Sequence, residues 1–144
     1  MEKKQREHLS PHFILYEFTR SGMAQEKGLS NDPNLEQRKA LTALCDNILE
    51  PLRQQFGPIV ISSGFRSQQV NSLVGGVKNS QHLTGEAVDI AACSVEQLRR
   101  YYNFISRNLD YDQLILEPDD DHPRWLHVSY TAKRRNRHNK VHLK

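Results

Sequence analysis

Three residues of metal-binding types occur in two short stretches of this chain. "SQHLTGEAVDI" (residues 80–90) contains His82 and Asp89, and "RWLHVSY" (residues 124–130) contains His127. Asp89 lies in an apolar run, where a carboxylate needs a strong partner or a metal ion. Two imidazoles and one carboxylate form the usual open ligand set of a catalytic zinc ion, with water in the fourth position. The three residues predict an open zinc site, although each one alone could also be an ordinary structural residue.

A carboxylate near the predicted zinc site is a candidate general base. "YDQLILEP" (residues 111–118) and "RWLHVSY" read as two strands joined by an acidic turn, and their alternation turns the leucines of both strands towards the core. Glu117 then lies on the same face of the sheet as His127. A carboxylate beside a zinc-bound water provides the base that hydrolysis needs. The alternative is that Glu117 is a surface residue at the end of a strand.

The remaining patterns predict the elements that would position these residues. Apolar residues at helical spacing indicate a long helix before Gly57, with Asn31 or Asp32 as its N-cap and a kink or break at Pro51. Near the N-terminus, Ser10 is expected to cap another short helix. The rest of the chain reads as strand, short helix, strand, helix and hairpin, over residues 59–62, 67–76, 85–93, 94–109 and 111–130. This order predicts an α+β fold with a mainly antiparallel sheet flanked by helices.

The composition is that of a single, rather polar globular domain. The chain has 144 residues, of which 37% are hydrophobic and 26% charged. No window approaches the roughly 18 consecutive apolar residues of a membrane-spanning helix. The N-terminal residues lack the apolar segment of a secretory signal, so we expect cytoplasmic synthesis, with any role outside the cytoplasm reached after release or export by other means. Cys45 and Cys93 occur in unrelated surroundings and are expected to be buried or half-buried free thiols.

Basic residues are concentrated at the C-terminus. The net charge is +3, and the last twelve residues, "KRRNRHNKVHLK", contain six Lys or Arg and no acid. Such a segment is typical of a solvated tail, although it could also contact nucleic acid, an anionic cell wall polymer or a membrane surface. No aromatic residues are interleaved with these charges, so nucleic-acid binding is not expected. We divide the chain into a domain over residues 1–132 and a basic tail over residues 133–144.

Several motifs together resemble a known family. They are "SGFRS" (residues 63–67), the pattern Ser-x-His-x-x-Gly-x-Ala-x-Asp (residues 80–89) and "WLHVS" (residues 125–129). In this combination the chain resembles the zinc D-alanyl-D-alanine carboxypeptidase family, whose relatives share the fold of the hedgehog signalling domain. The branch it is most similar to consists of small single-domain peptidases found in phages and bacterial genomes. The resemblance runs over nearly the whole chain except the basic tail.

The resemblance implies a function and a role for each matching residue. It implies a monomeric, zinc-dependent peptidase that hydrolyses peptidoglycan stem peptides, as a carboxypeptidase or an endopeptidase. The implied zinc ligands are His82, Asp89 and His127. Arg66 would hold the C-terminal carboxylate or a peptide carbonyl of the substrate, a task that suits a guanidinium group. Ser80 and Gln81 would orient the first ligand or the substrate.

The sequence departs from the family at one position. Many relatives carry the catalytic acid three residues before the last histidine, where this chain has Arg124, which cannot act as a base. Glu117 is the next candidate, followed by the acidic run Asp119–Asp121 and by His122. If none of these residues reaches the water, the chain would be a non-catalytic, zinc-containing module that binds the cell wall or a partner.

Overall fold

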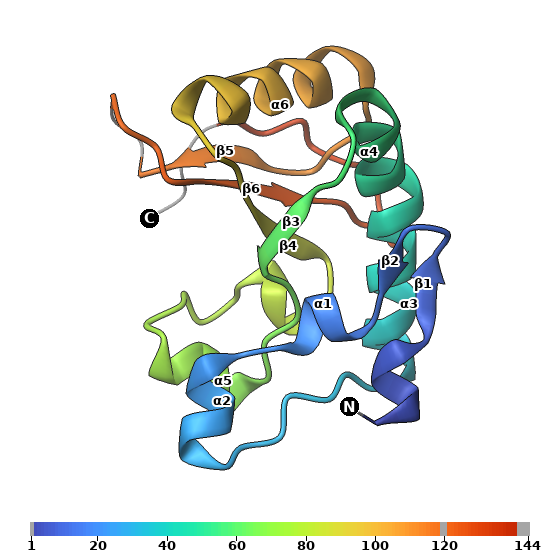
Figure 1. The fold of residues 1–144 in the computed structure, drawn as a ribbon, viewed down its shortest axis with the longest axis vertical. Coiled ribbons are helices and arrows are strands. Elements are labelled where there is room, and N and C mark those ends of the chain that lie inside the picture. The colour runs from blue at the N-terminus through green and yellow to red at the C-terminus, as the bar shows by residue number, and fades with distance from the viewer. Residues whose placement is uncertain (1, 119–120, 141–144) are drawn as a thin grey trace.

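The computed structural model describes residues 2–118 and 121–140 (Figure 1). Its helices are η1 (Lys3–Arg6), α1 (Tyr16–Thr19), α2 (Gly22–Lys27), α3 (Leu35–Leu44), η2 (Cys45–Leu49), α4 (Glu50–Phe56), α5 (Gln68–Leu73), η3 (Gln81–Thr84) and α6 (Val95–Asn108). Its strands are β1 (His8–Ser10), β2 (Phe13–Ile14), β3 (Val60–Ser63), β4 (Ala87–Ala91), β5 (Leu114–Glu117) and β6 (Trp125–Ser129). Among the helices of the described residues, none has the length and apolar character needed to cross a membrane.

A four-stranded antiparallel sheet is the centre of the fold. Its strand order is β3-β4-β6-β5, so the two strands that carry predicted metal ligands, β4 and β6, lie side by side in the middle. In the β5–β6 hairpin, Leu116 pairs with Leu126 and Leu114 with Val128, so the leucines share the predicted face. Helices α3, α4 and α6 flank the sheet (Figure 1). The predicted α+β class with a mainly antiparallel sheet is therefore confirmed.

The two faces of the sheet have different roles. One face carries the fully buried side chains of Val88, Ile90, Leu126 and Val128, which join a single core with apolar residues of α3, η2, α4 and α6. Burying one such side chain contributes about 1.5–3 kcal/mol to folding. Because side chains alternate along a strand, the residues between them, among them Asp89 and His127, point away from this core.

The long helix departs from the prediction at its start and at Pro51. Asn34, not Asn31 or Asp32, caps it: the Asn34 side chain accepts from the backbone N–H of Gln37, and the Gln37 side chain accepts from that of Asn34. The Asn31 amide is instead buried and donates to two backbone carbonyls. Pro51 does not break the helix, because the wide π turn η2 directly before α4 accommodates the missing N–H group.

The prediction for Ser10 was wrong. Ser10 ends the first strand of a small hairpin, β1–β2, and caps no helix. Its hydroxyl donates to Oε2 of Glu50 at 2.6 Å, and the backbone N–H of His12 donates to the same oxygen at 2.8 Å. These contacts tie the hairpin to α4, and Phe13 and Leu9 add buried apolar surface. Contacts with residues some 40 positions away therefore decide the local structure.

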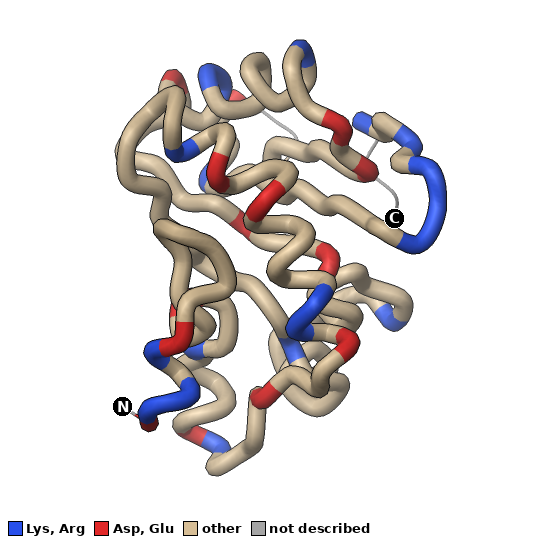
Figure 2. The backbone as a smooth tube through the Cα atoms, turned by 90° about the vertical axis from the view of Figure 1, so that its right-hand side faces the viewer, with Lys and Arg blue, Asp and Glu red and all other residues tan. Residues whose placement is uncertain are grey.

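The basic C-terminal segment does not lie free in solvent over its described part. Arg134 and Arg137 both form ion pairs with Asp112, at 2.8 Å each, and the Asp112 side chain is fully buried. Asn139 pairs with Gln113 next to the start of β5. Figure 2 shows the basic run as a blue stretch close to the C-terminal end of the drawn chain. The division of the chain after residue 132 remains a prediction.

Both cysteines are free thiols, as predicted. Cys45 is buried in the core as predicted, whereas Cys93 is exposed, so the predicted burial was wrong for Cys93. Burial raises the pKa of the Cys45 thiol far above its usual value, so this group is a small apolar residue of the core.

Candidate metal centre

The three predicted ligands meet at the middle of the sheet. Asp89 on β4 pairs directly with His127 on β6, so their side chains leave the sheet on the same face. His82 reaches them from η3, the turn before β4. The Oδ1 atom of Asp89 lies 3.0 Å from Nδ1 of His127 and 3.3 Å from Nε2 of His82. One possible ligand atom from each residue lies within 4.8 Å of the others, a separation that a single metal ion can bridge.

Backbone geometry sets the spacing between His82 and Asp89. The hydroxyl oxygen of Ser80 accepts a hydrogen bond of 3.1 Å from the backbone N–H of His82 and so caps η3. Gly85 ends the turn in the left-handed conformation, with φ at 76°. A Cβ atom on Gly85 would lie 2.4 Å from the carbonyl oxygen of Gln37. Only glycine therefore lets the chain turn from η3 into β4 beside α3.

The loop after β3 holds His82 in one orientation. The His82 side chain is 2% exposed, and its Nδ1 donates to the carbonyl oxygen of Gly64 at 2.7 Å. The backbone N–H of Arg66 donates in return to the carbonyl oxygen of His82 at 3.1 Å. Because a carbonyl oxygen can only accept, the proton belongs on Nδ1, and Nε2 directs its lone pair towards Asp89. This is the arrangement that a metal-binding imidazole needs.

Asp89 is ionised in this environment. Burial alone would raise the pKa of its carboxyl group, but the hydrogen bond from His127 and the electrostatic effect of the adjacent His82 outweigh burial and hold that pKa well below its usual range. An ionised carboxylate beside two imidazoles is a donor set that zinc commonly takes. The residues present therefore fit the predicted ion.

Arg66 adds a positive charge to the site. Its guanidinium group is partly buried, and burial lowers its pKa, whereas the charges of Asp89 and Glu117 raise it. Its buried Nε atom has no hydrogen-bond acceptor among the described residues. Arg66 thus lies within electrostatic reach of the metal ligands and keeps donors available. This arrangement is compatible with the predicted contact to a substrate carboxylate or carbonyl.

Glu117 lies at the end of β5, partly buried, on the same face as His127. The register places Ile115 opposite His127 and Glu117 opposite Trp125, so Glu117 and His127 are diagonal neighbours on the sheet. The charge of Glu117 also reaches Arg66. The predicted shared face is confirmed by this register, and the role of Glu117 as base stays a prediction.

The other candidate bases are placed less favourably or are not described. Asp119 and Asp120 lie outside the described residues. Asp121 and His122 are exposed in the turn of the hairpin. Arg124 closes this hairpin, because its backbone N–H donates to the carbonyl oxygen of Glu117 at 2.8 Å. Its side chain is exposed.

Sequence reasoning missed Asp112, a buried acid that binds η3, the turn that carries His82. The Gln81 amide donates to Oδ2 of Asp112 at 3.0 Å, and Arg134 and Arg137 bind the same carboxylate. Hydrogen bonds from these side chains hold the pKa of Asp112 well below its usual range, although burial acts in the opposite direction. No local pattern marks Asp112, because Arg134 and Arg137 follow it by more than twenty residues. Gln81, predicted to orient the first ligand or the substrate, connects η3 to this network.

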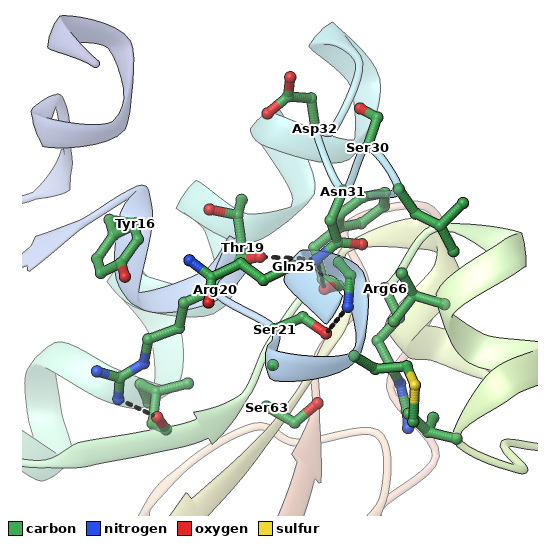
Figure 3. Close-up of a pocket in the computed structure, with 18 of the residues that line it drawn as sticks. Tyr16, Thr19, Arg20, Ser21, Gln25, Ser30, Asn31, Asp32, Ser63 and Arg66 are labelled. Atoms are coloured by element: carbon green, nitrogen blue, oxygen red, sulfur yellow. Dashed lines mark hydrogen bonds between the residues drawn. The ribbon is translucent and has the colours of Figure 1, made fainter. Parts of the chain in front are cut away.

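A groove leads away from the metal ligands along the free edge of β3. Asp89, Ser63 and Arg66 line one part of it, and α1, α2 and the loop after α2 line the opposite wall (Figure 3). Its volume is about 1310 Å³, which is ample for several residues of an extended peptide. The site is therefore open on one side to a chain-like substrate.

Comparison with known proteins gives two matches. A family model described as Peptidase M15 matches residues 11–129. A zinc D-Ala-D-Ala carboxypeptidase of Streptomyces albus G is 40% identical over 63 residues, which cover 39% of this chain. The chain spans only 25% of the length of that relative. The family match includes all three predicted metal ligands, together with Arg66 and Glu117.

Proposed function

Because this chain belongs to the peptidase M15 family, we propose that it is a zinc metallopeptidase that hydrolyses peptidoglycan stem peptides. The observation that carries the proposal is the convergence of His82, Asp89 and His127, whose possible ligand atoms lie within 4.8 Å of one another. The similarity to a zinc D-Ala-D-Ala carboxypeptidase supports both the ion and the class of substrate. We propose that the protein acts as a monomer, on cell wall reached by release or by export through other means.

The zinc ion would be held by His82, Asp89 and His127. When bound, it supplies a water molecule whose pKa is lowered to roughly 7 in well-known cases. Hydrogen bonding by Gly64 and Ser80 to His82 fixes one ligand before the ion arrives, which reduces the ordering cost of binding.

Glu117 acts as the general base. Its position on the face of His127 supports this role. It accepts a proton from the attacking water and later passes it to the leaving amine. Arg66 donates to the C-terminal carboxylate or to a carbonyl of the substrate and so orients the scissile bond. Ser80 and Gln81 act through the orientation of η3, since their side chains bond to the His82 backbone and to Asp112.

Metal content and hydrolysis, measured together, test this function. The wild-type protein should bind about one zinc per chain and release new amines or D-alanine from purified peptidoglycan. The variant His127→Ala should lose most of the zinc and the hydrolysis, because two remaining ligands bind zinc weakly. His8→Ala, which removes an exposed histidine from β1, is the matched control and should retain both. Wild-type protein that takes up no zinc would overturn the proposal.

A non-catalytic, zinc-containing binding module is the second candidate. The observation that favours it is Arg124, which occupies the place where the resembled family carries an acid. Under this alternative the wild-type protein holds zinc and binds peptidoglycan in a pull-down, but it releases no amines. The same pair of measurements therefore separates the two functions.

A further inference from the structure

The groove beside the metal ligands has the free edge of a β-sheet as one wall. β3 is the outer strand of the sheet on this side, and Val60, Ile61, Ser62 and Ser63 all line the groove. Val60 is 56% exposed, an unusual value for an apolar residue of a strand. A free strand edge offers backbone N–H and C=O groups to which an extended peptide can add as a further strand.

Arg20 occupies this edge. Its Nη2 atom donates to the carbonyl oxygen of Ile61, a residue that lines the groove, at 2.7 Å. Arg20 is exposed and follows the last residue of α1. A guanidinium group has five N–H donors, so a single bond to Ile61 leaves most of them available. The bond also holds a long side chain in place before any ligand arrives.

No carboxylate neutralises Arg20 within the part of the chain that the structure describes, where its one side-chain bond goes to Ile61. Besides the metal ligand Asp89, the acidic residues Glu2 and Asp32 line the groove. Asp32 accepts a hydrogen bond from Gln5 and points away from the Arg20 guanidinium (Figure 3). Arg20 is therefore a positioned cation that faces an open groove without a carboxylate partner among the described residues.

The register relates Arg20 to the metal centre. Ser63 on β3 pairs with the metal ligand Asp89, and Ile61 precedes Ser63 by two residues. Two residues of an extended strand span roughly 7 Å, so Ile61 and Ser63 are separated by about the length of two residues of an added peptide. In Figure 3 the guanidinium groups of Arg20 and Arg66 lie on opposite sides of Ser63. A peptide whose C-terminus is held at Arg66 would thus continue past Ser63 towards Arg20.

We propose that the groove along β3 binds the amino-terminal side of the substrate as an extended strand and that Arg20 selects a side-chain carboxylate at the second residue before the scissile bond. This inference rests on the proposed peptidase function and adds the substrate class: acidic peptides in preference to their neutral counterparts. Arg20 contacts substrate under this proposal and takes no part in the chemical step.

Matched peptides test the selection. The probes are N-acetyl-L-Glu-D-Ala-D-Ala and N-acetyl-L-Gln-D-Ala-D-Ala, which differ by one charge and have nearly the same shape. Hydrolysis of both is measured with zinc-loaded protein, and binding of the corresponding products, N-acetyl-L-Glu-D-Ala and N-acetyl-L-Gln-D-Ala, is measured by calorimetry. The binding arm does not require catalysis, so failure of hydrolysis counts against the proposed function and leaves the inference to be decided by binding.

We expect wild-type protein to hydrolyse and bind the glutamate member of each pair about five- to tenfold better than the glutamine member. A positioned, charge-assisted hydrogen bond accounts for a preference of this size. Arg20→Gln should abolish the preference, and Arg20→Lys should restore part of it. Arg99→Gln, which changes an exposed arginine of α6 outside the groove, should leave the preference unchanged. Equal binding of the two products by wild type, or a preference that survives in Arg20→Gln, would overturn the inference. A drop in thermal stability of Arg20→Gln without any change in preference would identify Arg20 as a structural cap of the β3 edge and also overturn it.

Discussion

At the scale of single residues, the metal centre depends on side chains that are fixed before an ion binds. Asp89 stays ionised because two histidines share its Oδ1 atom, and His82 is kept in one tautomer by the Gly64 carbonyl. Such contacts reduce the freedom that the ligands would otherwise lose on binding. The same contacts explain why a charged group is tolerated on a strand between Val88 and Ile90, which are fully buried.

Replacement of Glu117 tests the proposed base. Glu117→Gln keeps the size of the side chain but removes the proton acceptor, so we expect kcat to fall by about 10²–10⁴ while the zinc content stays unchanged. The measurement is the release of amines from peptidoglycan, together with elemental analysis of the same sample. Glu36→Gln, at an exposed position of α3, serves as the control. Retention of wild-type kcat in Glu117→Gln would assign the base to another residue.

The candidate metal ligands could be predicted from the sequence better than the residues that hold them in place. His82, Asp89 and His127 were predicted because ligand chemistry limits the residue types and because the strand pattern marks Asp89 as unusual. The role of Asp112 was not predictable, since its partners Arg134 and Arg137 follow it by more than twenty residues in a segment that looks like a tail. Pairing of this kind is decided by tertiary structure, which leaves no local pattern.

At the scale of elements, the junction between η3 and β4 is the most constrained part of the site. Gly85 has a positive φ, and any Cβ there would collide with backbone of α3. We expect Gly85→Ala to lower the free energy of unfolding by about 2–4 kcal/mol, from backbone strain and the displacement of α3. We also expect weaker zinc binding, because the turn carries His82.

Gly22 provides the matched control for this change. It lies in α2 with ordinary backbone angles, and nothing lies within 4 Å of where its Cβ would be. Gly22→Ala should therefore be neutral or stabilise the protein by up to about 1 kcal/mol. Urea unfolding of both variants measures the difference. Equal stability of the two variants would contradict the steric account of Gly85.

Helices and strands were predictable where their own pattern was long. Ser94 caps α6 as predicted, and the β5–β6 hairpin has the expected facing of its side chains. The hairpin β1–β2 was missed because its strands have only three and two residues. Its stability comes from Glu50 on α4, a contact that no local window contains.

At the scale of the whole molecule, Asp112 connects the chain end to the sheet and to the metal-bearing turn. It binds Arg134 and Arg137 of the C-terminal segment and Gln81 of η3. Because the folded-state pKa of Asp112 lies below its unfolded value, the folded protein binds fewer protons at acidic pH. The stabilisation is complete above the unfolded pKa of about 3.9 and is lost as the pH falls through the lower folded value.

Removal of this charge should change the acid sensitivity of the fold. We expect Asp112→Asn to cost about 2–3 kcal/mol at neutral pH and to make the decline of stability below about pH 5 shallower than in wild type. Urea midpoints between acidic and neutral pH measure this dependence. Asp121→Asn, at an exposed position, should follow the wild-type curve. An Asp112→Asn curve parallel to that of wild type would contradict the assigned pKa direction.

Digestion of purified peptidoglycan by the zinc-loaded protein, followed by mass spectrometry of the fragments, tests the central claim most directly. The account predicts stem peptides shortened at one defined bond, with the new amine or D-alanine recovered in equal amount, and no such change with His127→Ala. The fragment masses also show which bond is cut, and the position of that bond identifies the enzyme as a carboxypeptidase or an endopeptidase. If wild-type protein carrying one zinc per chain leaves every fragment unchanged, the hydrolytic account is contradicted.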